Sequence, residues 1–307
     1  MPPAISTQFP DVLDARFARI FDEQFKQLPD RIPAIYGTPS TMGPQKQDVR
    51  FSDVGAFGDV PEFTGTVDYD DVYEQYDYTF THKEYAAGFQ IQRKLFDDDL
   101  HGIMDAKPQG MSTAYQRTRQ KHAAQPFNLA FSVDSTWQAG GDGVALCSNS
   151  HTTRSPGVST ATGFDNLVTA AFSAVSLAAA RIQFRGYRGD RGERLSNVPD
   201  TIIHPPDLYM EVFEVTQSAG KPDTALNNRN VHEGAYRNID WEYLTDANNW
   251  FLVDMAQMKQ FLYWLDRIQK EFAMVEDFDT IIGKWRLYAR YSLGWRGWRW
   301  ALGAQVT

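Results

Sequence analysis

The stretch Thr201-Ile-Ile-His-Pro-Pro-Asp-Leu-Tyr209 decides the fold, because it predicts a buried strand that passes directly into a helix. Its first three residues are β-branched, as strand residues often are. Pro206 suits the first turn of a helix, where the missing N–H costs nothing. The apolar residues that follow recur at helical spacing: Leu208, Val212 and Val215. This junction is typical of many folds that mix helix and sheet, and it indicates no chemistry by itself.

The clearest period in the chain lies downstream of this junction. From Trp285 to Trp295 every second residue is apolar, and the residues between them are mostly polar. The pattern predicts a strand with one buried face that is longer than the usual ~5 to 6 residues, so we expect a sheet that spans the molecule. Shorter elements precede it: a strand at Trp250–Val253, a helix at Met258–Leu265 and a strand at Glu271–Phe278.

Upstream of the junction, residues 10–29 predict an amphipathic helix that Pro29 and Pro33 stop. The segment from Tyr36 to Gly65 has little periodicity and is expected to be extended, without a core of its own. Alternating apolar residues predict strands within residues 72–93.

Two longer helices are expected between these strands and the junction. The first runs through Tyr115 to Leu129, and Pro126 is expected to kink or end it. A glycine-, serine- and threonine-rich loop follows over residues 139–162. Asp165 is the expected N-cap of the second helix, whose apolar stripe is predicted to contain Val168, Ala171, Phe172, Val175, Ala179 and Ile182.

Composition excludes several classes of protein. The chain of 307 residues carries a net charge of −9, which argues against a general nucleic-acid binder. A single cysteine, Cys147, excludes an internal disulfide and a cysteine-based zinc site. No apolar run has the ~20 residues of a membrane span, and no signal sequence is evident, so we expect synthesis in a cytosol and no membrane contact.

Charge is unevenly distributed along the chain. Residues 53–105 are rich in acids, including Asp68, Asp70, Asp71 and Glu74, whereas residues 281–307 contain basic side chains and no acid. The basic set is Lys284, Arg286, Arg290, Arg296 and Arg299. Oppositely charged ends could attract each other between copies of the protein, or each could be an ordinary solvated face.

Candidate sites for chemistry are weak. Cys147 and His151 could imitate a nucleophile and its base, but no third group is indicated. Asp97-Asp98-Asp99 with His101 could bind a divalent metal, although a cluster at a helix end explains these acids better. His204 reads as a hydrogen-bonded core histidine, and Gly186–Gly192 as an exposed turn. The tail Trp295–Trp300 mixes cations and rings as single-strand binders do, yet the alternation assigns its tryptophans to a sheet face. No metal or cofactor is expected.

In this order of elements the chain resembles the major capsid proteins of tailed bacteriophages, which have the Hong Kong 97 fold. The residues that carry the resemblance are Tyr85–Asp99, a strand leading to an acidic entry of the spine helix, the junction Pro199–Tyr209, and the closing strand Trp285–Trp295. Asn149-Ser-His151, after Gly143, is similar to a loop of the Mu-like major head subunits.

The resemblance implies an α+β fold in five segments. These are an N-terminal arm (1–45), an extended β-hairpin loop (46–84), a peripheral domain with the long spine helix (85–200), an axial domain (201–265) and a return to the peripheral sheet (266–307). It also implies a structural protein, not an enzyme, that assembles as pentamers and hexamers into an icosahedral shell around packaged double-stranded DNA. Implied partners are further copies of the chain, a separate scaffolding protein, a portal, a decoration protein and non-specifically bound DNA.

The arm and the loop are the expected contacts between copies. Their candidate contact residues, with the basic residues of the closing strand, are Phe17, Phe21, Phe25, Asp68, Asp70, Asp71, Glu74, Arg286 and Arg290. The resemblance places the protein in the virion capsid. Two alternatives stay open: another virion component, such as a decoration or tail protein, and a hydrolase that uses the Cys147 and His151 loop. Lys83 is the only lysine near the loop that could form a crosslink, and no partner for it is marked.

Overall fold

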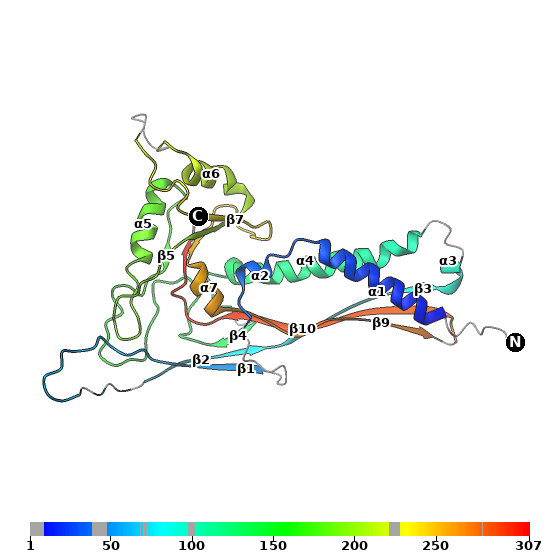
Figure 1. The fold of residues 1–307 in the computed structure, drawn as a ribbon, viewed down its shortest axis with the longest axis horizontal. Coiled ribbons are helices and arrows are strands. Elements are labelled where there is room, and N and C mark those ends of the chain that lie inside the picture. The colour runs from blue at the N-terminus through cyan, green and yellow to red at the C-terminus, as the bar shows by residue number, and fades with distance from the viewer. Residues whose placement is uncertain are drawn as a thin grey trace.

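The computed structural model of the chain describes residues 9–38, 48–67, 69, 71, 73–97, 102–134, 136–220, 228–277 and 279–307. Within these residues the strands form three sheets. Figure 1 shows an elongated molecule, in which a long body of sheet and helix extends to one side, a lobe stands above its other end, and a loop protrudes below that lobe.

The long body is built on a sheet of three antiparallel strands in the order β3-β10-β9. These strands are β3 (Lys83–Gln92), β10 (Ile282–Trp295) and β9 (Leu262–Asp277). Two helices, α1 (Phe9–Gln27) and α4 (Ala106–Asn128), pack against each other along this sheet (Figure 1). The period-2 pattern of β10 explains the packing, because it turns Trp285, Leu287 and Ala289 to one side, where all three are buried.

The lobe is a five-stranded sheet with helices packed on it. Its strand order is β5-β11-β8-β6-β7, with β5 at Leu167–Val168, β11 at Ala301–Ala304, β8 at Trp250–Val253, β6 at Thr201–His204 and β7 at Arg237–Asp240. α5 (Ala174–Phe184) and α6 (Tyr209–Gln217) lie on the lobe, and α7 (Met255–Phe261) leads from β8 into β9. We call this unit the five-stranded lobe.

The third sheet carries the protruding loop. Its strand order is β1-β2-β4, with β1 at Asp48–Val54, β2 at Glu74–Thr81 and β4 at Gln138–Gly140. Gly140 has a φ of +100°, and a Cβ there would lie 1.9 Å from the carbonyl oxygen of Asp77, so only glycine fits where β4 meets β2. The described residues between Gly55 and Tyr73, after β1 and before β2, belong to the loop at the lower left of Figure 1. The chain also contains two short helices, α2 (Ile32–Ile35) and α3 (Arg93–Asp97).

The junction that decides the fold is confirmed. β6 is buried along its whole length, and a 3₁₀ turn over Pro206–Leu208 leads into α6. Leu208, Val212 and Val215 are buried as expected. The strands at Trp250–Val253 and Trp285–Trp295 are confirmed too, and the α+β class holds.

The expected helix after Asp165 is wrong in its start and in its buried face. The N-cap is Ser173, whose hydroxyl accepts a hydrogen bond from the Ser176 N–H in a capping box. Leu167–Val168 is a strand instead of helix. Because the helix begins later, its inner face is Ala174, Leu177, Ala180 and Phe184, while the predicted core residues Val175 and Ile182 are 66% and 75% exposed.

Three other expectations need correction. The helix predicted at Met258–Leu265 is α7, and it ends at Phe261 because Leu262 already begins the 16-residue strand β9. The segment from Tyr36 to Gly65 does contribute to the core, through buried Tyr36, and it contains β1. Pro126 does not end the helix at its own position, because α4 continues to Asn128; a kink there stays a prediction. The domain boundaries stay a prediction, and the five-stranded lobe draws strands from residues 167–168 and 301–304 as well as from 201–265.

Candidate functional site: surfaces for self-association

The candidate catalytic residues Cys147 and His151 are buried and stabilise the fold. Cys147 is 2% exposed, and burial raises the pKa of its thiol, so it carries no reactive thiolate at the surface. His151 is also buried: its Nδ1 lies 2.6 Å from Asp142 Oδ2, its Nε2 lies 3.2 Å from Asn166 Oδ1, and its ring stacks on Trp298. These bonds fix the glycine-rich loop on the body, and they leave no pair that could act as nucleophile and base.

The other candidate groups follow the same pattern. His204 is buried, with Nδ1 2.9 Å from the carbonyl oxygen of Pro205, and burial lowers its pKa. Trp298 and Trp300 are buried, so the tail presents neither ring for base stacking. Among the residues that the structure describes, no three His, Cys, Asp or Glu side chains gather to hold a metal. Residues 98–101, with most of the acidic cluster, lie outside the described residues.

The protruding loop presents a row of apolar side chains to solvent. Their exposed fractions range from 63% to 93%, and the residues are Val54, Phe57, Val60, Phe63, Val67 and Tyr69. Large apolar side chains that gather on one exposed segment are typical of a surface that a partner covers. An extended segment was predicted here, but these exposed residues were not; the signal for them was isolated rings in a polar stretch.

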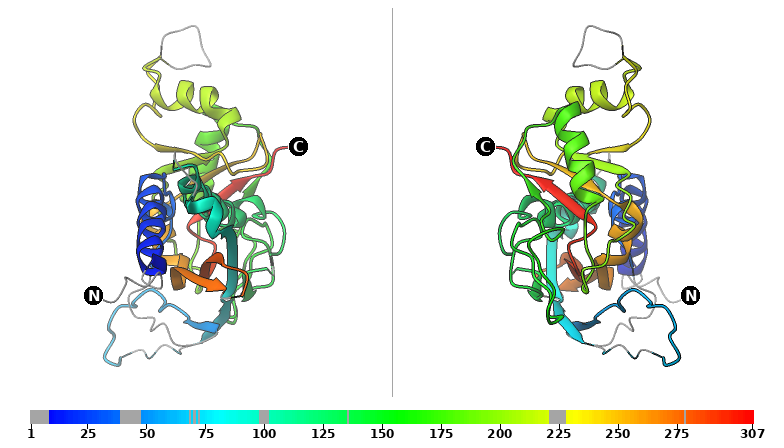
Figure 2. Two further views of the ribbon diagram at one scale, coloured as in Figure 1. Left: turned by 90° about the vertical axis from the view of Figure 1, so that its right-hand side faces the viewer. Right: turned by 90° about the vertical axis from the view of Figure 1, so that its left-hand side faces the viewer.

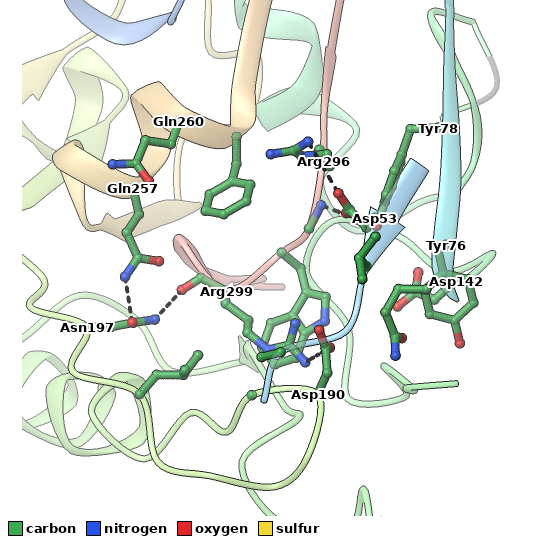
Figure 3. Close-up of a pocket in the computed structure, with 18 of the residues that line it drawn as sticks. Asp53, Tyr76, Tyr78, Asp142, Asp190, Asn197, Gln257, Gln260, Arg296 and Arg299 are labelled. Atoms are coloured by element: carbon green, nitrogen blue, oxygen red, sulfur yellow. Dashed lines mark hydrogen bonds and ion pairs between the residues drawn. The ribbon is translucent and has the colours of Figure 1, made fainter. Parts of the chain in front are cut away.

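A pocket lies at the base of the loop, and an ion pair in it holds the end of β1 against the segment after β10 (Figure 3). The pocket has a volume of about 510 Å³ and lies where the end of β1 meets the segment after β10. Arg296 Nη1 lies 3.3 Å from Asp53 Oδ1, and Arg299 Nη2 lies 3.0 Å from Asp190 Oδ1. Burial raises the pKa of Asp53, and the Arg296 guanidinium opposes that rise.

The start of β2 pairs with the end of β1, and hydrogen bonds hold it at the same pocket. Gln75 is buried, its amide nitrogen donates to the Ser155 hydroxyl at 3.0 Å, and its amide oxygen accepts from the Arg154 backbone N–H at 3.1 Å. Tyr78, also on β2, accepts a hydrogen bond from the Gly297 N–H. Both strands that carry the loop are therefore anchored, so the loop projects from a rigid base.

An apolar groove of about 770 Å³ runs between α4 and β3. It is lined mostly by small and apolar side chains, which include Ala86, Ala87, Phe89, Ala106, Met111, Ala114 and Leu287. The charged side chain of Lys107 also lines it. Gly110 also lines the groove, and a Cβ built on it meets nothing within 4 Å. The groove is thus open to solvent in the single chain.

The aromatic residues predicted as contacts between copies lie on α1 and pack against their own chain. Phe17 and Phe21 are fully buried, with ring centroids 5.1 Å from Trp285 and 5.2 Å from Phe272, so in this conformation they offer no surface to a neighbour. Phe25 is half-buried against Tyr115. In the single chain the apolar face of the arm helix packs on β9 and α4, which supply a matching apolar face. A role of these residues between copies stays a prediction.

The charged candidates are placed differently again. Asp71 and Glu74 are exposed, whereas Asp68 and Asp70 lie outside the described residues. Arg290 Nε lies 3.8 Å from Glu84 Oε1, and three more basic residues of the tail also have acidic partners: Lys284 pairs with Asp277, Arg296 with Asp53 and Arg299 with Asp190. Arg286 is exposed, and no ion pair to it is present among the described residues. Two of these pairs, Arg290 with Glu84 and Arg296 with Asp53, join the acidic segment to the basic tail within one chain; attraction between copies stays a prediction.

Solved structures share this fold. The chain aligns with a subunit of the mature capsid of bacteriophage PhiM1 at a TM-score of 0.61 and 10% identity, over 92% of this chain and 88% of that one. It aligns with the capsid of a native GTA particle at 0.53 and 12%, over 90% of each chain. It aligns with the procapsid of bacteriophage JBD30 at 0.53 and 14%, over 98% of this chain and 76% of that one. No curated protein sequence matches the chain.

These likenesses define the class: the chain has the Hong Kong 97 fold of phage shell subunits. Residues 76–302 match the model of the family described as phage capsid protein, so the chain belongs to that family. It is a major capsid protein that forms the shell. The similarity of the Asn149–His151 loop to Mu-like subunits stays a prediction.

In the part of the chain that the structure describes, none of the helices is both long and apolar enough to cross a membrane.

Proposed function

We propose that the protein assembles as pentamers and hexamers into an icosahedral shell around packaged double-stranded DNA, with the extended loop lying over a neighbouring copy. The observation that carries the proposal is the row of exposed apolar side chains between Val54 and Tyr69, which the chain itself leaves uncovered. Covering them against a neighbour would remove apolar surface from water, the main favourable term in protein association.

The groove between α4 and β3 is the surface that best suits the loop of a neighbour. It is apolar and open, and Lys107 at its edge complements the acids of the loop, including exposed Asp59 and Glu62. Because both strands of the loop are anchored at their base, the loop is held in position before it meets a neighbour, which lowers the entropy cost of the contact.

The role proposed is structural instead of catalytic. Burial of Cys147 and His151 favours a shell subunit over the alternative hydrolase, and membership of a capsid family favours it over a tail or decoration component. By resemblance we also propose a separate scaffolding protein, a portal and a decoration protein as partners, non-specific contact with DNA at the inner surface, and synthesis in the host cytoplasm before incorporation into the virion.

Replacing two rings of the loop tests the proposal. Phe57→Ser with Phe63→Ser, at positions 71% and 70% exposed, should leave the melting temperature of the subunit unchanged and abolish closed shells in electron micrographs. Val133→Ser is the matched control, since Val133 is 64% exposed but lies outside the loop. Normal shells from the double variant would show that the loop does not bind neighbours.

A substitution in the groove tests the receiving surface separately. Gly110→Glu adds a charge where a Cβ meets no atom, and glutamate is a better helix former than glycine, so the subunit should fold at least as well. Shell formation should fail, because the charge would be buried under the loop of a neighbour. Gln109→Glu, on the same helix but outside the groove, should assemble normally. Equal assembly of both variants would contradict the proposed place of the loop.

A further inference from the structure

The outer face of α6 is apolar along one side and acidic along the other. Val212 and Val215 fix the buried face. Opposite them Tyr209, Met210 and Phe213 are 50%, 64% and 50% exposed, and the rings of Tyr209 and Phe213 stack with their centroids 6.1 Å apart. The remaining exposed positions include Asp207, Glu211 and Glu214, and the helix contains no basic residue.

The outer face of α5 is its counterpart. Val175, Ala179 and Ile182 recur at helical spacing, are exposed, and so form an apolar stripe. The helix contains no acid. Arg185 follows its last turn beside the stripe and is exposed, whereas Arg181 is half-buried and donates a hydrogen bond from Nη1 to the Tyr236 hydroxyl at 3.2 Å.

These two faces cannot cover each other within one chain. α5 runs along one side of the five-stranded lobe, and α6 lies across its outer end (Figures 1 and 2). Each helix uses its inner face on the lobe, so the two outer faces point to solvent in different directions. A second copy can supply each of them with a partner.

We propose that α6 of one copy packs across α5 of the next copy, in a repeating contact around the axis of a capsomer. This inference rests on the proposed assembly into pentamers and hexamers. Opposite charge favours the unlike pair, since two α6 faces would bring Glu211 and Glu214 against the same acids, and two α5 faces would bring Arg185 against itself. A contact between unlike faces is head-to-tail, and such contacts close into rings when the rotation allows.

Cysteine crosslinking tests the pairing directly. The chain with Ile182→Cys and Phe213→Cys, assembled and treated with a flexible bismaleimide, should give a ladder of dimers, trimers and larger species. Neither single variant alone should give dimers, but a co-assembled mixture of the two single variants should. The native Cys147 is buried and does not compete. Dimers from one single variant would show a contact between like faces and overturn the proposal, as would shells in which the double variant stays unlinked.

Charge reversal gives a second measurement that needs no label. Arg185→Glu should lower the yield of shells at least about fivefold by setting like charges opposite each other, and adding Glu214→Arg should restore most of the yield. Both positions are exposed, so the melting temperature of the subunit should not move. If Arg185→Glu assembles as well as the native chain, this contact is wrong while the shell function stands; if the native chain itself forms no shells, the proposed function fails first.

Discussion

Replacing Phe21 with alanine should destabilise the single subunit, because the arm helix is part of the chain's own core. Phe21 is fully buried, its ring stacks on Phe272 with centroids 5.2 Å apart, and Lys270 Nζ lies 5.5 Å from the ring. Removing a fully buried phenylalanine typically costs about 3–5 kcal/mol. Since a native domain is stable by only about 5–15 kcal/mol, this loss would remove a large part of the subunit's free energy of unfolding.

The measurement is urea unfolding of the unassembled subunit, followed by tryptophan fluorescence. Phe21→Ala should move the midpoint strongly at an unchanged slope, and Phe25→Ala, at a half-buried position on the same helix, should move it less. Phe57→Ala, 71% exposed on the loop, should change the free energy of unfolding by no more than about 0.5 kcal/mol. An unchanged midpoint for Phe21→Ala would refute the reasoning, because α1 would then be free in the isolated subunit and would dock only on a neighbour.

Three further predictions concern single positions. Burial lowers the pKa of His122 to about 4; the unfolded chain binds this proton near pH 6.5, so stability is full above that pH and falls as the pH drops from about 6.5 through 4. After allowance for partial solvent contact the loss should be about 1–2 kcal/mol in urea unfolding, and His122→Gln should lack it. Iodoacetamide should label Cys147 only in urea, and labelling of the native subunit at the unfolded rate would contradict its burial. Gly140→Ala should cost about 1–3 kcal/mol by forcing a Cβ onto the Asp77 carbonyl; a melting temperature equal to that of the native chain would show that β4 can shift freely.

Local periodicity predicted the elements in which the pattern of apolar residues alone shows which face is buried. The alternation of β10 and the proline junction after β6 were recognised because each pattern is continuous and matches one period. The start of α5 was predicted wrongly because Asp165 and Ser173 are both acceptable N-caps. Between them, Leu167–Val168 becomes a strand only because Leu167 pairs with Gly303, which is distant in sequence. Sequence could not choose between the two caps.

The candidate surfaces were harder to predict because they depend on residues that are distant in sequence. The charge asymmetry suggested attraction between copies, but folding brings Arg296 beside Asp53 and Arg290 beside Glu84 in the same chain. In the same way, an amphipathic helix does not indicate whether its partner is its own sheet or a neighbour's, and in the single chain Phe17 and Phe21 pack on their own sheet. An extended segment was predicted before β2 and the loop lies in it, but Tyr36 of the same segment is buried in the core and β1 is part of a sheet.

The hairpin of β9 and β10 has a mechanical consequence for a subunit that is built into a shell. These two strands, of 16 and 14 residues, run the length of the body, and β10 continues through a short turn into β11 of the five-stranded lobe. A force that pulls the lobe away from the far end of the body acts along the strands. Both strands join the lobe at one end and each other at the far end, so the pull runs along two covalent backbones side by side and stretches the subunit little.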